Sequence, residues 1–301
     1  MSEPVKLTDA SAYESFLDKY DTFLIDCDGV IWHGNNVLPN LREALSVLRK
    51  KGKKLLFVSN NSAKSRKGYL KKFKKLNIEI HDGEIFGSAY ASAYYIKNVL
   101  KFPKEKKVYV VGDVGIIEEL ESEGIRYAGA NEDSNFDTSN WDFANIKQDP
   151  EVGAVLCGFD IHVNYLKYAK AFTYLNSNPE CLFFLTNDDP TFPANGTIYP
   201  GGGAIAAPLI TALGRKPDGI FGKPNKPMLD CIIQHLNLNP ERTCMIGDRL
   251  DTDILFGING GLGTLFVLTG VNKEQDILAM DARIIPDYYM ASLGDISVLD
   301  K

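Results

Sequence analysis

Short apolar runs alternate with helical patterns at both ends of the chain. Residues 22–27 and 54–59 are apolar runs of strand length, and the segments 41–51 and 65–76 carry apolar side chains at helical spacing. The same order returns from residue 219 onward. Strands that alternate with helices form parallel sheets that are covered by helices on both faces. The sequence therefore predicts an α/β protein.

A long central stretch has strand and helix patterns of its own. Its strand candidates are 108–112, 153–159 and 181–186, and a helical pattern covers 165–175. A stretch of this length is too long to be a connection inside a compact domain. We therefore predict a discontinuous, Rossmann-like core domain and an inserted α/β cap domain. The predicted core comprises residues 1–102 and 216–301, and the predicted cap comprises residues 103–215.

Composition narrows the choice of partners and compartment. The 301 residues carry a net charge of −6, with 39 acidic and 33 basic residues, which argues against a nucleic-acid partner bound by bulk positive charge. The basic run 64–75 has apolar residues at helical spacing, so we expect its lysines on a solvated face. No apolar stretch reaches the length of a membrane span. The N-terminus resembles no secretory signal, and the five cysteines show no paired spacing, so we expect reduced thiols in the cytoplasm.

Polar residues stand at the ends of four predicted strands. Ligands of an open parallel sheet bind beyond the carboxyl ends of its strands, so we expect these residues to meet in one crevice. They are Asp26 and Asp28, Ser59 and Asn60, Lys223, and Asp248 and Asp253.

The two acids of the first strand predict a cation. In an extended segment Asp26 and Asp28 point to the same side, and their charges repel unless a cation lies between them. Carboxylate oxygens without a histidine or thiolate cluster suit Mg²⁺, which favours phosphate oxygens as further ligands. Ser59 and the backbone N–H groups after it can hold such oxygens, and Lys223 supplies positive charge.

Four motifs carry a family resemblance: DCDGV (26–30), VSNNS (58–62), GKPNKPM (222–228) and GDRLDTD (247–253). In this order and at strand ends, the set resembles the haloacid dehalogenase superfamily of phosphatases. The phrases DCDGVIWHG, SNNSAKSR, FGKPNKPM and MIGDRLDTDI are most similar to its 4-nitrophenylphosphatase and phosphoglycolate phosphatase branch. The position of the insertion, after the second motif, matches the large α/β cap of that branch.

The resemblance implies the catalytic roles. Asp26 would be the nucleophile that forms an aspartyl phosphate, and Asp28 would protonate the leaving group and then activate water. Mg²⁺ would be held by the carboxylates of Asp26 and Asp248 and the backbone carbonyl of Asp28. Asp253 would orient Lys223 or metal-bound waters, or would only cap the following helix.

The resemblance also implies how phosphate is bound. Ser59, Asn60 and Lys223 would contact the phosphoryl oxygens. Gly29 would keep the turn after Asp28 narrow, so that its own N–H can approach the phosphate.

The cap is expected to select the substrate. The segment 184–193 resembles the cap loop of this branch, and we single out Asp189 and Phe192 as specificity residues. Phe192 stands where pyridoxal phosphatases carry histidine, which weakens that assignment. We predict a phosphoric monoester hydrolase for small metabolites such as 2-phosphoglycolate, with 4-nitrophenyl phosphate as an artificial substrate. The alternatives are a pyridoxal phosphate phosphatase, a phosphomutase and a non-catalytic phosphate-binding scaffold; a homodimer formed through the cap is a further expectation.

A glycine cluster gives a weaker signal. Gly201, Gly203 and Ala206 approach a dinucleotide-binding fingerprint, but no clear strand leads into them. We therefore expect a turn or hinge there.

Overall fold

The computed structural model describes residues 3–135, 139, 142–194 and 196–300. The chain divides into two compact units. The first comprises Met1–Ser59, Leu70–Phe86 and Lys223–Lys301, and the second comprises Asn60–Tyr69 and Gly87–Gly222. Residues 60–69, 87–102 and 216–222, which we assigned to the core domain, thus group with the second unit. That the central stretch is a separate cap domain stays a prediction.

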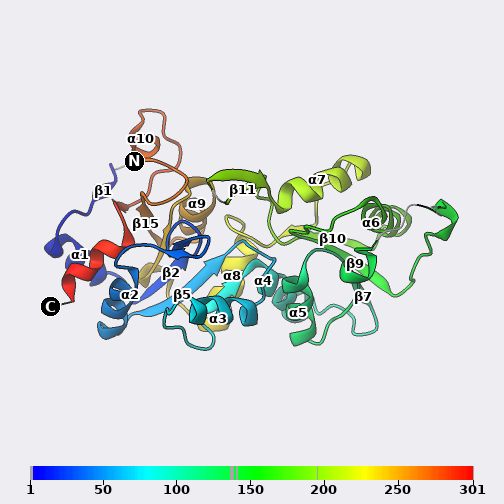
Figure 1. The fold of residues 1–301 in the computed structure, drawn as a ribbon, viewed down its shortest axis with the longest axis horizontal. Coiled ribbons are helices and arrows are strands. Elements are labelled where there is room, and N and C mark those ends of the chain that lie inside the picture. The colour runs from blue at the N-terminus through cyan, green and yellow to red at the C-terminus, as the bar shows by residue number, and fades with distance from the viewer. Residues whose placement is uncertain (1–2, 136–138, 140–141, 195, 301) are drawn as a thin grey trace. The chain divides into compact units, whose positions relative to one another are not determined.

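The first unit is built on a seven-stranded sheet with the order β1-β16-β15-β14-β2-β5-β6 (Figure 1). Strand β2 pairs in parallel with β5 on one side and β14 on the other. All five residues of β2 are buried, as expected for a central strand. The strands are Val5–Lys6 (β1), Thr22–Asp26 (β2), Lys54–Ser59 (β5), Ile85–Gly87 (β6), Thr243–Gly247 (β14), Gly263–Val267 (β15) and Tyr288–Met290 (β16).

Amphipathic helices pack around this sheet. Helix α2 buries its leucines, and in α3 the ring of Phe73 packs on Phe57 of β5 with centroids 4.7 Å apart. A short hairpin follows the first motif, with strands Trp32–His33 (β3) and Asn36–Val37 (β4). The helices of this unit are Ala10–Leu17 (α1), Leu41–Lys50 (α2), Lys226–Leu236 (α8), Leu255–Asn259 (α9) and Glu274–Leu278 (α10). Helix α3 (Arg66–Lys75) belongs to this unit from Leu70 onward.

The second unit has a five-stranded parallel sheet with the order β13-β10-β9-β7-β8. Its strands are Lys107–Val111 (β7), Arg126–Gly129 (β8), Val152–Cys157 (β9), Leu182–Leu185 (β10) and Gly219–Ile220 (β13). An antiparallel hairpin is formed by Thr191–Ala194 (β11) and Thr197–Pro200 (β12). The helices are Ser88–Tyr94 (α4), Val114–Ser122 (α5), Tyr165–Ser177 (α6) and Gly202–Leu213 (α7).

A buried ion pair fixes the loop between β9 and α6. The Nζ atom of Lys167 lies 2.7 Å from Oδ2 of Asp160, and both side chains are fully buried. The other carboxylate oxygen of Asp160 accepts the backbone N–H of His162. Burying two charges is favourable only with such close pairing, so the pair locks this loop onto the first turns of α6.

The predicted α/β class is confirmed, and the strand ends agree closely with the sequence-based ranges. Residues 219–220, which we placed in the core sheet, instead form β13 and pair with β10 of the second unit. The ring of Phe221 packs against Phe184 of β10, 5.4 Å away, which favours this pairing.

The glycine cluster does not form the turn or hinge that we expected. Strand β12 leads into it, and Gly202 begins helix α7. A Cβ atom on Gly201 or Gly203 would lie 2.4 or 2.3 Å from a backbone oxygen of Asp189 or Asp188. The glycines therefore permit close approach of the loop that carries these two acids.

The five cysteines are all free and buried, in agreement with the expected reduced thiols.

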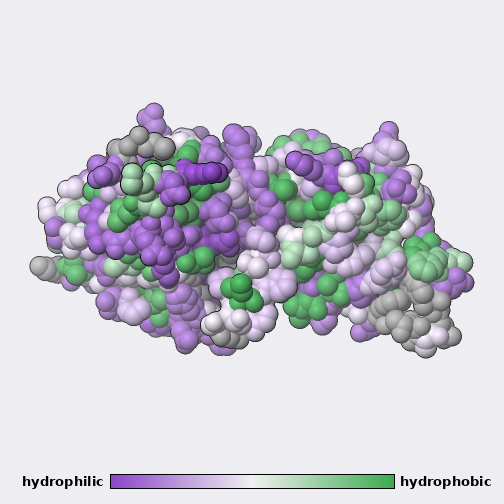
Figure 2. Space-filling model, turned by 90° about the horizontal axis from the view of Figure 1, so that it is seen from above, coloured by the Kyte–Doolittle hydropathy of each residue, from purple (hydrophilic) through white to green (hydrophobic). Residues whose placement is uncertain are grey.

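Figure 2 shows hydrophobic residues interspersed with hydrophilic ones over the face drawn. Among the residues that the structure describes, no helix combines the length and apolar character needed to cross a membrane.

Candidate functional site

Asp26 and Lys223 form the centre of the site. Asp26 is the last residue of β2, and Lys223 directly precedes the loop into α8. The Nζ atom of Lys223 lies 2.5 Å from Oδ1 of Asp26 and also donates to the backbone carbonyl of Val58, 3.1 Å away. Val58 is the partner of Asp26 in the β2–β5 ladder. Two neighbouring strand ends thus hold the ammonium group, although 197 residues separate the lysine from the aspartate.

Asp248 and Asp253 complete a buried acidic cluster. The Nζ atom of Lys223 forms an ion pair with Oδ1 of Asp253 at 2.7 Å. The carboxylates of Asp26, Asp248 and Asp253 each offer one oxygen within 4.8 Å of the others, and all three residues are buried. The cluster therefore contains three acids, of which Asp26 and Asp253 pair with Lys223.

Asp253 does more than cap a helix. Its Oδ2 accepts the backbone N–H groups of Asp248 and Arg249, at 3.2 and 3.1 Å. Its other oxygen faces Lys223. Asp253 therefore fixes both the loop that carries Asp248 and the position of the lysine, which is the geometry expected of an orienting residue.

Burial and charge shift the pKa values of this cluster. Burial raises the pKa of Asp26 well above its usual range; Lys223 opposes this shift, and Asp253 and Asp248 add to it. Burial and the neighbouring Asp253 raise the pKa of Asp248 to about 7. Burial alone would lower the pKa of Lys223, but Asp253 and Asp26 raise it above its usual range, so the ammonium stays charged.

The donor set fits a hard divalent cation. Three buried carboxylates with one lysine leave an excess of negative charge when all are ionised, and such a cluster is stabilised by a further cation. All of its ligand atoms are carboxylate oxygens. Cys27 lies next to Asp26 in the chain, but burial raises the pKa of its thiol well above the usual range, which disfavours a thiolate ligand.

Asp28 has different surroundings from those we expected. Strand β2 ends at Asp26, so the alternation of an extended segment does not continue to Asp28. Its Oδ1 accepts the indole N–H of Trp32 at 2.8 Å and lies 3.8 Å from Nζ of Lys72. The acids that raise the pKa of Asp26 are instead Asp253 and Asp248. The basic run was predicted to be a solvated face, yet the side chain of Lys72 is only 14% exposed.

Gly29 has a backbone conformation and a close neighbour that a side chain at this position would not allow. Its φ is +93°, and a Cβ atom there would lie 2.6 Å from Oδ2 of Asp248. Its N–H donates to the carbonyl of Trp32 within the turn, so this N–H already has a partner and is not the free phosphate donor that we expected. The hydroxyl of Thr269 donates to the Gly29 carbonyl at 2.6 Å. The glycine thus makes room for Asp248 beside the first motif.

The second motif divides between the two units. Ser59 ends β5 and is buried, directly after the Val58 carbonyl that binds Lys223. Asn60 belongs to the second unit, where its Nδ2 donates to Oδ2 of Asp189 at 3.0 Å. Its carbonyl accepts the side chains of Ser88 and Asn187, at 2.6 and 2.8 Å. One predicted phosphate ligand is therefore tied to a predicted specificity residue.

Phe192 lies on the β11–β12 hairpin of the second unit. Its ring packs edge-on against Phe159 at 5.2 Å and beside Tyr199 at 6.0 Å. The sequence pattern did not identify Phe159 or Asn187 as neighbours of the cap loop. Nor did it identify Trp32, Lys72 or Thr269 as neighbours of the first motif, although the place of Lys72 beside Phe73 on α3 was a usable signal.

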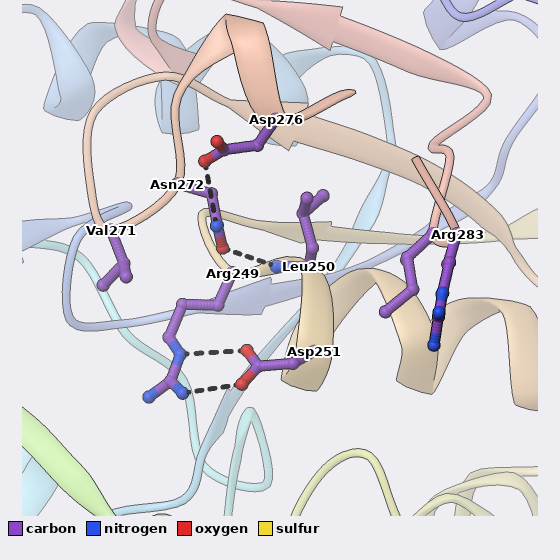
Figure 3. A pocket seen from close by; sticks show the side chains of 8 residues that line it. Arg249, Leu250, Asp251, Val271, Asn272, Asp276 and Arg283 are labelled. Atoms are coloured by element: carbon purple, nitrogen blue, oxygen red, sulfur yellow. Dashed lines mark hydrogen bonds and ion pairs between the residues drawn. The ribbon is translucent and has the colours of Figure 1, made fainter. Parts of the chain in front are cut away.

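A separate pocket of about 360 Å³ lies in the first unit (Figure 3). Val271 forms part of its wall and donates its N–H to Oδ2 of Asp248 at 2.8 Å. Arg249 is held by Asp251, and Asn272 bridges the backbone of Leu250 and the side chain of Asp276. The other residues that line the pocket are Arg283 and Ile284. None of the lining residues is a predicted site residue.

Comparisons with known proteins identify the family of this chain. Residues 23–126 match the haloacid dehalogenase-like hydrolase family, and residues 220–296 match a second model described as HAD-hydrolase-like. The chain belongs to the haloacid dehalogenase-like hydrolases, which confirms the resemblance predicted from the four motifs.

Individual relatives resemble the chain over nearly its full length. It is 48% identical to 4-nitrophenylphosphatase of Schizosaccharomyces pombe, covering 97% of this chain and 98% of that protein. It is 42% identical to phosphoglycolate phosphatase 2 of Arabidopsis thaliana, covering 97% of each. These relatives confirm the predicted enzyme class, a phosphoric monoester hydrolase.

Solved structures support the fold. The p-nitrophenyl phosphatase from Archaeoglobus fulgidus is 30% identical with a TM-score of 0.78, covering 93% of this chain and 99% of that one. A glycerol phosphate phosphatase from Mycobacterium tuberculosis, solved in complex with magnesium, is 25% identical with a TM-score of 0.78. The match covers 93% of this chain and 77% of that one.

Proposed function

We propose that this enzyme is a Mg²⁺-dependent phosphomonoesterase that acts on small phosphorylated metabolites. The proposed type of natural substrate is 2-phosphoglycolate, and 4-nitrophenyl phosphate is the proposed artificial substrate. The observation that carries the proposal is the contact of Lys223 with Asp26 beside Asp248 and Asp253. The substrate class is supported by relatives named for these two phosphate esters.

Asp26 is the proposed nucleophile. One of its carboxylate oxygens attacks phosphorus, the bond to the leaving oxygen breaks, and an aspartyl phosphate forms on Asp26. Lys223 masks the charge of the carboxylate and stabilises the negative charge of the transferred group. Asp28 gives its proton to the leaving oxygen in the same step.

Water then completes the cycle. Asp28, now a carboxylate, takes a proton from a water molecule whose oxygen bonds to phosphorus, and the bond to Asp26 breaks. Inorganic phosphate leaves, and both aspartates return to their starting states. Ser59 and Asn60 are the proposed ligands of the phosphoryl oxygens; the hydrogen bond of Asn60 to Asp189 would then link phosphate binding to the specificity loop.

Mg²⁺ is the proposed metal. The residues that would hold it are Asp26 and Asp248 through their carboxylates and Asp28 through its backbone carbonyl. When bound, it would neutralise charge on the phosphate and on the acids. The excess of buried carboxylates over lysine supports this assignment.

The test is acid-quenched mass spectrometry of the enzyme during turnover of 4-nitrophenyl phosphate with Mg²⁺. We expect a covalent adduct of one phosphoryl group that hydroxylamine removes and that the Asp26→Asn variant lacks. Asp26→Asn should also lose turnover while keeping its circular dichroism spectrum. An adduct on another residue, or wild-type turnover by Asp26→Asn, would refute the assignment of the nucleophile.

A substrate panel tests the specificity. It compares phosphoglycolate, glycerol phosphate, pyridoxal phosphate and sugar phosphates, each with phosphate release and product analysis. The highest kcat/KM on phosphoglycolate would support the proposal. A preference for pyridoxal phosphate, phosphoryl transfer to an added sugar phosphate, or no release from any ester would favour a pyridoxal phosphatase, a phosphomutase or a scaffold, respectively.

A homodimer through the second unit is part of the proposal. Large apolar side chains are exposed on this unit, and a second copy of the chain would cover such a surface. They are Phe143, Ile161, Tyr165, Ile198 and Tyr199. Light scattering of the purified protein should give twice the monomer mass, and an Ile198→Glu variant should reduce it; a monomeric wild type would contradict this part.

A further inference from the structure

The two carboxylate oxygens of Asp28 have different surroundings. Oδ1 accepts the indole N–H of Trp32 at 2.8 Å and lies 3.8 Å from the ammonium of Lys72. Within the part of the chain that the structure describes, no hydrogen bond reaches Oδ2. The Asp28 side chain is 43% exposed. Oδ1 thus accepts one hydrogen bond and lies near an ammonium group, whereas no hydrogen bond is made to Oδ2.

The two donors are themselves held in place. Trp32 is fully buried, and its ring packs edge-on against Phe73 with centroids 4.9 Å apart. The ammonium of Lys72 lies 3.9 Å from the centre of the Trp32 ring, which is a close cation–π contact. Lys72 thus binds the indole and the carboxylate together. Neither donor can follow a rotation of the Asp28 side chain without giving up this packing.

Lys72 differs from its neighbours in the basic run. Lys71, Lys74 and Lys75 are exposed on the same helix, whereas Lys72 is largely buried against Trp32. Burying a flexible lysine side chain costs conformational entropy and hydration. Its contacts with the indole ring and with Asp28 offset this cost.

We propose that Trp32 and Lys72 are positioning residues that orient Asp28 for proton transfer. An oxygen that faces N–H donors is a poor place for a further hydrogen, so the proton of the acid form belongs on Oδ2. This inference rests on the proposed function, in which Asp28 is the acid and base.

The proton balance is simple. In the first half-reaction the Oδ2–H proton passes to the leaving oxygen as its bond to phosphorus breaks and the Asp26 oxygen bonds to phosphorus. In the second, Oδ2 takes one proton from water as the hydroxide oxygen bonds to phosphorus and the Asp26–phosphorus bond breaks. In both half-reactions Oδ1 keeps the hydrogen bond from Trp32 and stays near the ammonium of Lys72.

The test compares two aryl phosphates that differ by one nitro group, 4-nitrophenyl phosphate and phenyl phosphate. The nitrophenolate leaves with little help from an acid, whereas phenolate needs the proton. The ratio kcat/KM reports the steps up to the first irreversible transfer and therefore isolates this requirement. The variants are Lys72→Met and Trp32→Phe, with Lys72→Arg as the conservative variant and Lys71→Met as the matched control.

We expect Lys72→Met and Trp32→Phe to lower kcat/KM about tenfold for phenyl phosphate, in the range of losses from orienting residues. For 4-nitrophenyl phosphate the same variants should lose about twofold or less, since transfer to that leaving group needs little proton donation. Lys72→Arg should restore most of the loss, because it keeps the charge and the stacking on the indole ring. Lys71→Met should match wild type on both substrates.

Equal losses on both substrates would overturn the inference, because a general loss of structure has no preference for a leaving group. The inference would also be overturned if Lys71→Met lost as much kcat/KM as Lys72→Met, because such a loss would reflect the overall charge of the helix. Asp28→Asn serves as the reference for the proposed function. If Asp28→Asn shows the steeper loss on phenyl phosphate and the Lys72 and Trp32 variants do not, only the positioning role fails. If Asp28→Asn itself shows no such preference, the acid–base role of Asp28 fails.

Discussion

Replacing Asp248 by asparagine should stabilise the metal-free enzyme while removing its activity. The side chain is almost fully buried and shares its surroundings with Asp26 and Asp253, but the cluster contains only one lysine. Asparagine keeps the shape and can still accept the N–H of Val271 at the position of Oδ2. The substitution therefore removes a charge with little change in packing.

The size of the effect follows from the pKa of Asp248. Burial and Asp253 raise it from 3.8 to about 7, so the folded protein binds this proton more tightly than the unfolded chain does. The free energy of unfolding of the wild type therefore falls as the pH rises from 3.8 to about 7. At about 1.4 kcal/mol for each pKa unit, the full cost above pH 7 is about 4 kcal/mol. Because neighbouring acids can take up protons in its place, we expect a gain of about 2 to 4 kcal/mol.

The assay is thermal unfolding in EDTA at pH 8 and pH 5.5, with Asp251→Asn as an exposed control in the same loop. Asp248→Asn should raise Tm by roughly 5 to 10 °C at pH 8 and by less at pH 5.5. Mg²⁺ should raise Tm of the wild type but not of this variant, because the variant lacks a proposed ligand. An unchanged or lower Tm at pH 8, or an equal gain at both pH values, would refute the reasoning.

Three further predictions concern other parts of the molecule. Gly29→Ala should lower the free energy of unfolding by about 1–3 kcal/mol, because it strains the backbone and collides with Asp248; an unchanged denaturation midpoint would contradict this. Lys167→Met should cost about 3–5 kcal/mol by leaving Asp160 buried and unpaired, and a second change, Asp160→Leu, should recover most of the loss in the same denaturation experiment. Chelation of divalent metal should abolish phosphate release, and added Mg²⁺ should restore it; full activity in EDTA would count against a metal-dependent reaction.

Strand ends were the most predictable feature of this chain. Apolar runs bounded by polar residues locate β2, β5 and β14 because a buried parallel strand tolerates few polar side chains. The predicted meeting of Asp26 with Lys223 and Asp248 follows from the same rule, and the structure places these side chains together. Their catalytic roles stay predictions.

Side-chain partners were less predictable than strand ends. The contact of Lys72 with Trp32 depends on how α3 is rotated about its axis, which the spacing of charges alone does not specify. The orientation of Asp28 depends on where β2 ends, because one residue more of extended chain would turn its side chain to another side. The assignment of β13 to a sheet depends on packing between aromatic rings far apart in the sequence, which a pattern of single segments does not record.

The five buried thiols also make this chain a convenient object for chemical labelling. Burial raises the pKa of every one of them, so reagents that attack thiolates find little to react with while the protein is folded. A single cysteine introduced on an exposed loop could therefore be labelled with a dye or spin label while the native thiols react little. In the unmodified chain, the rate of maleimide uptake by Cys27, Cys157, Cys181 and Cys244 would in turn report opening of the two sheets, because these four cysteines lie in or next to strands, whereas Cys231 lies in α8.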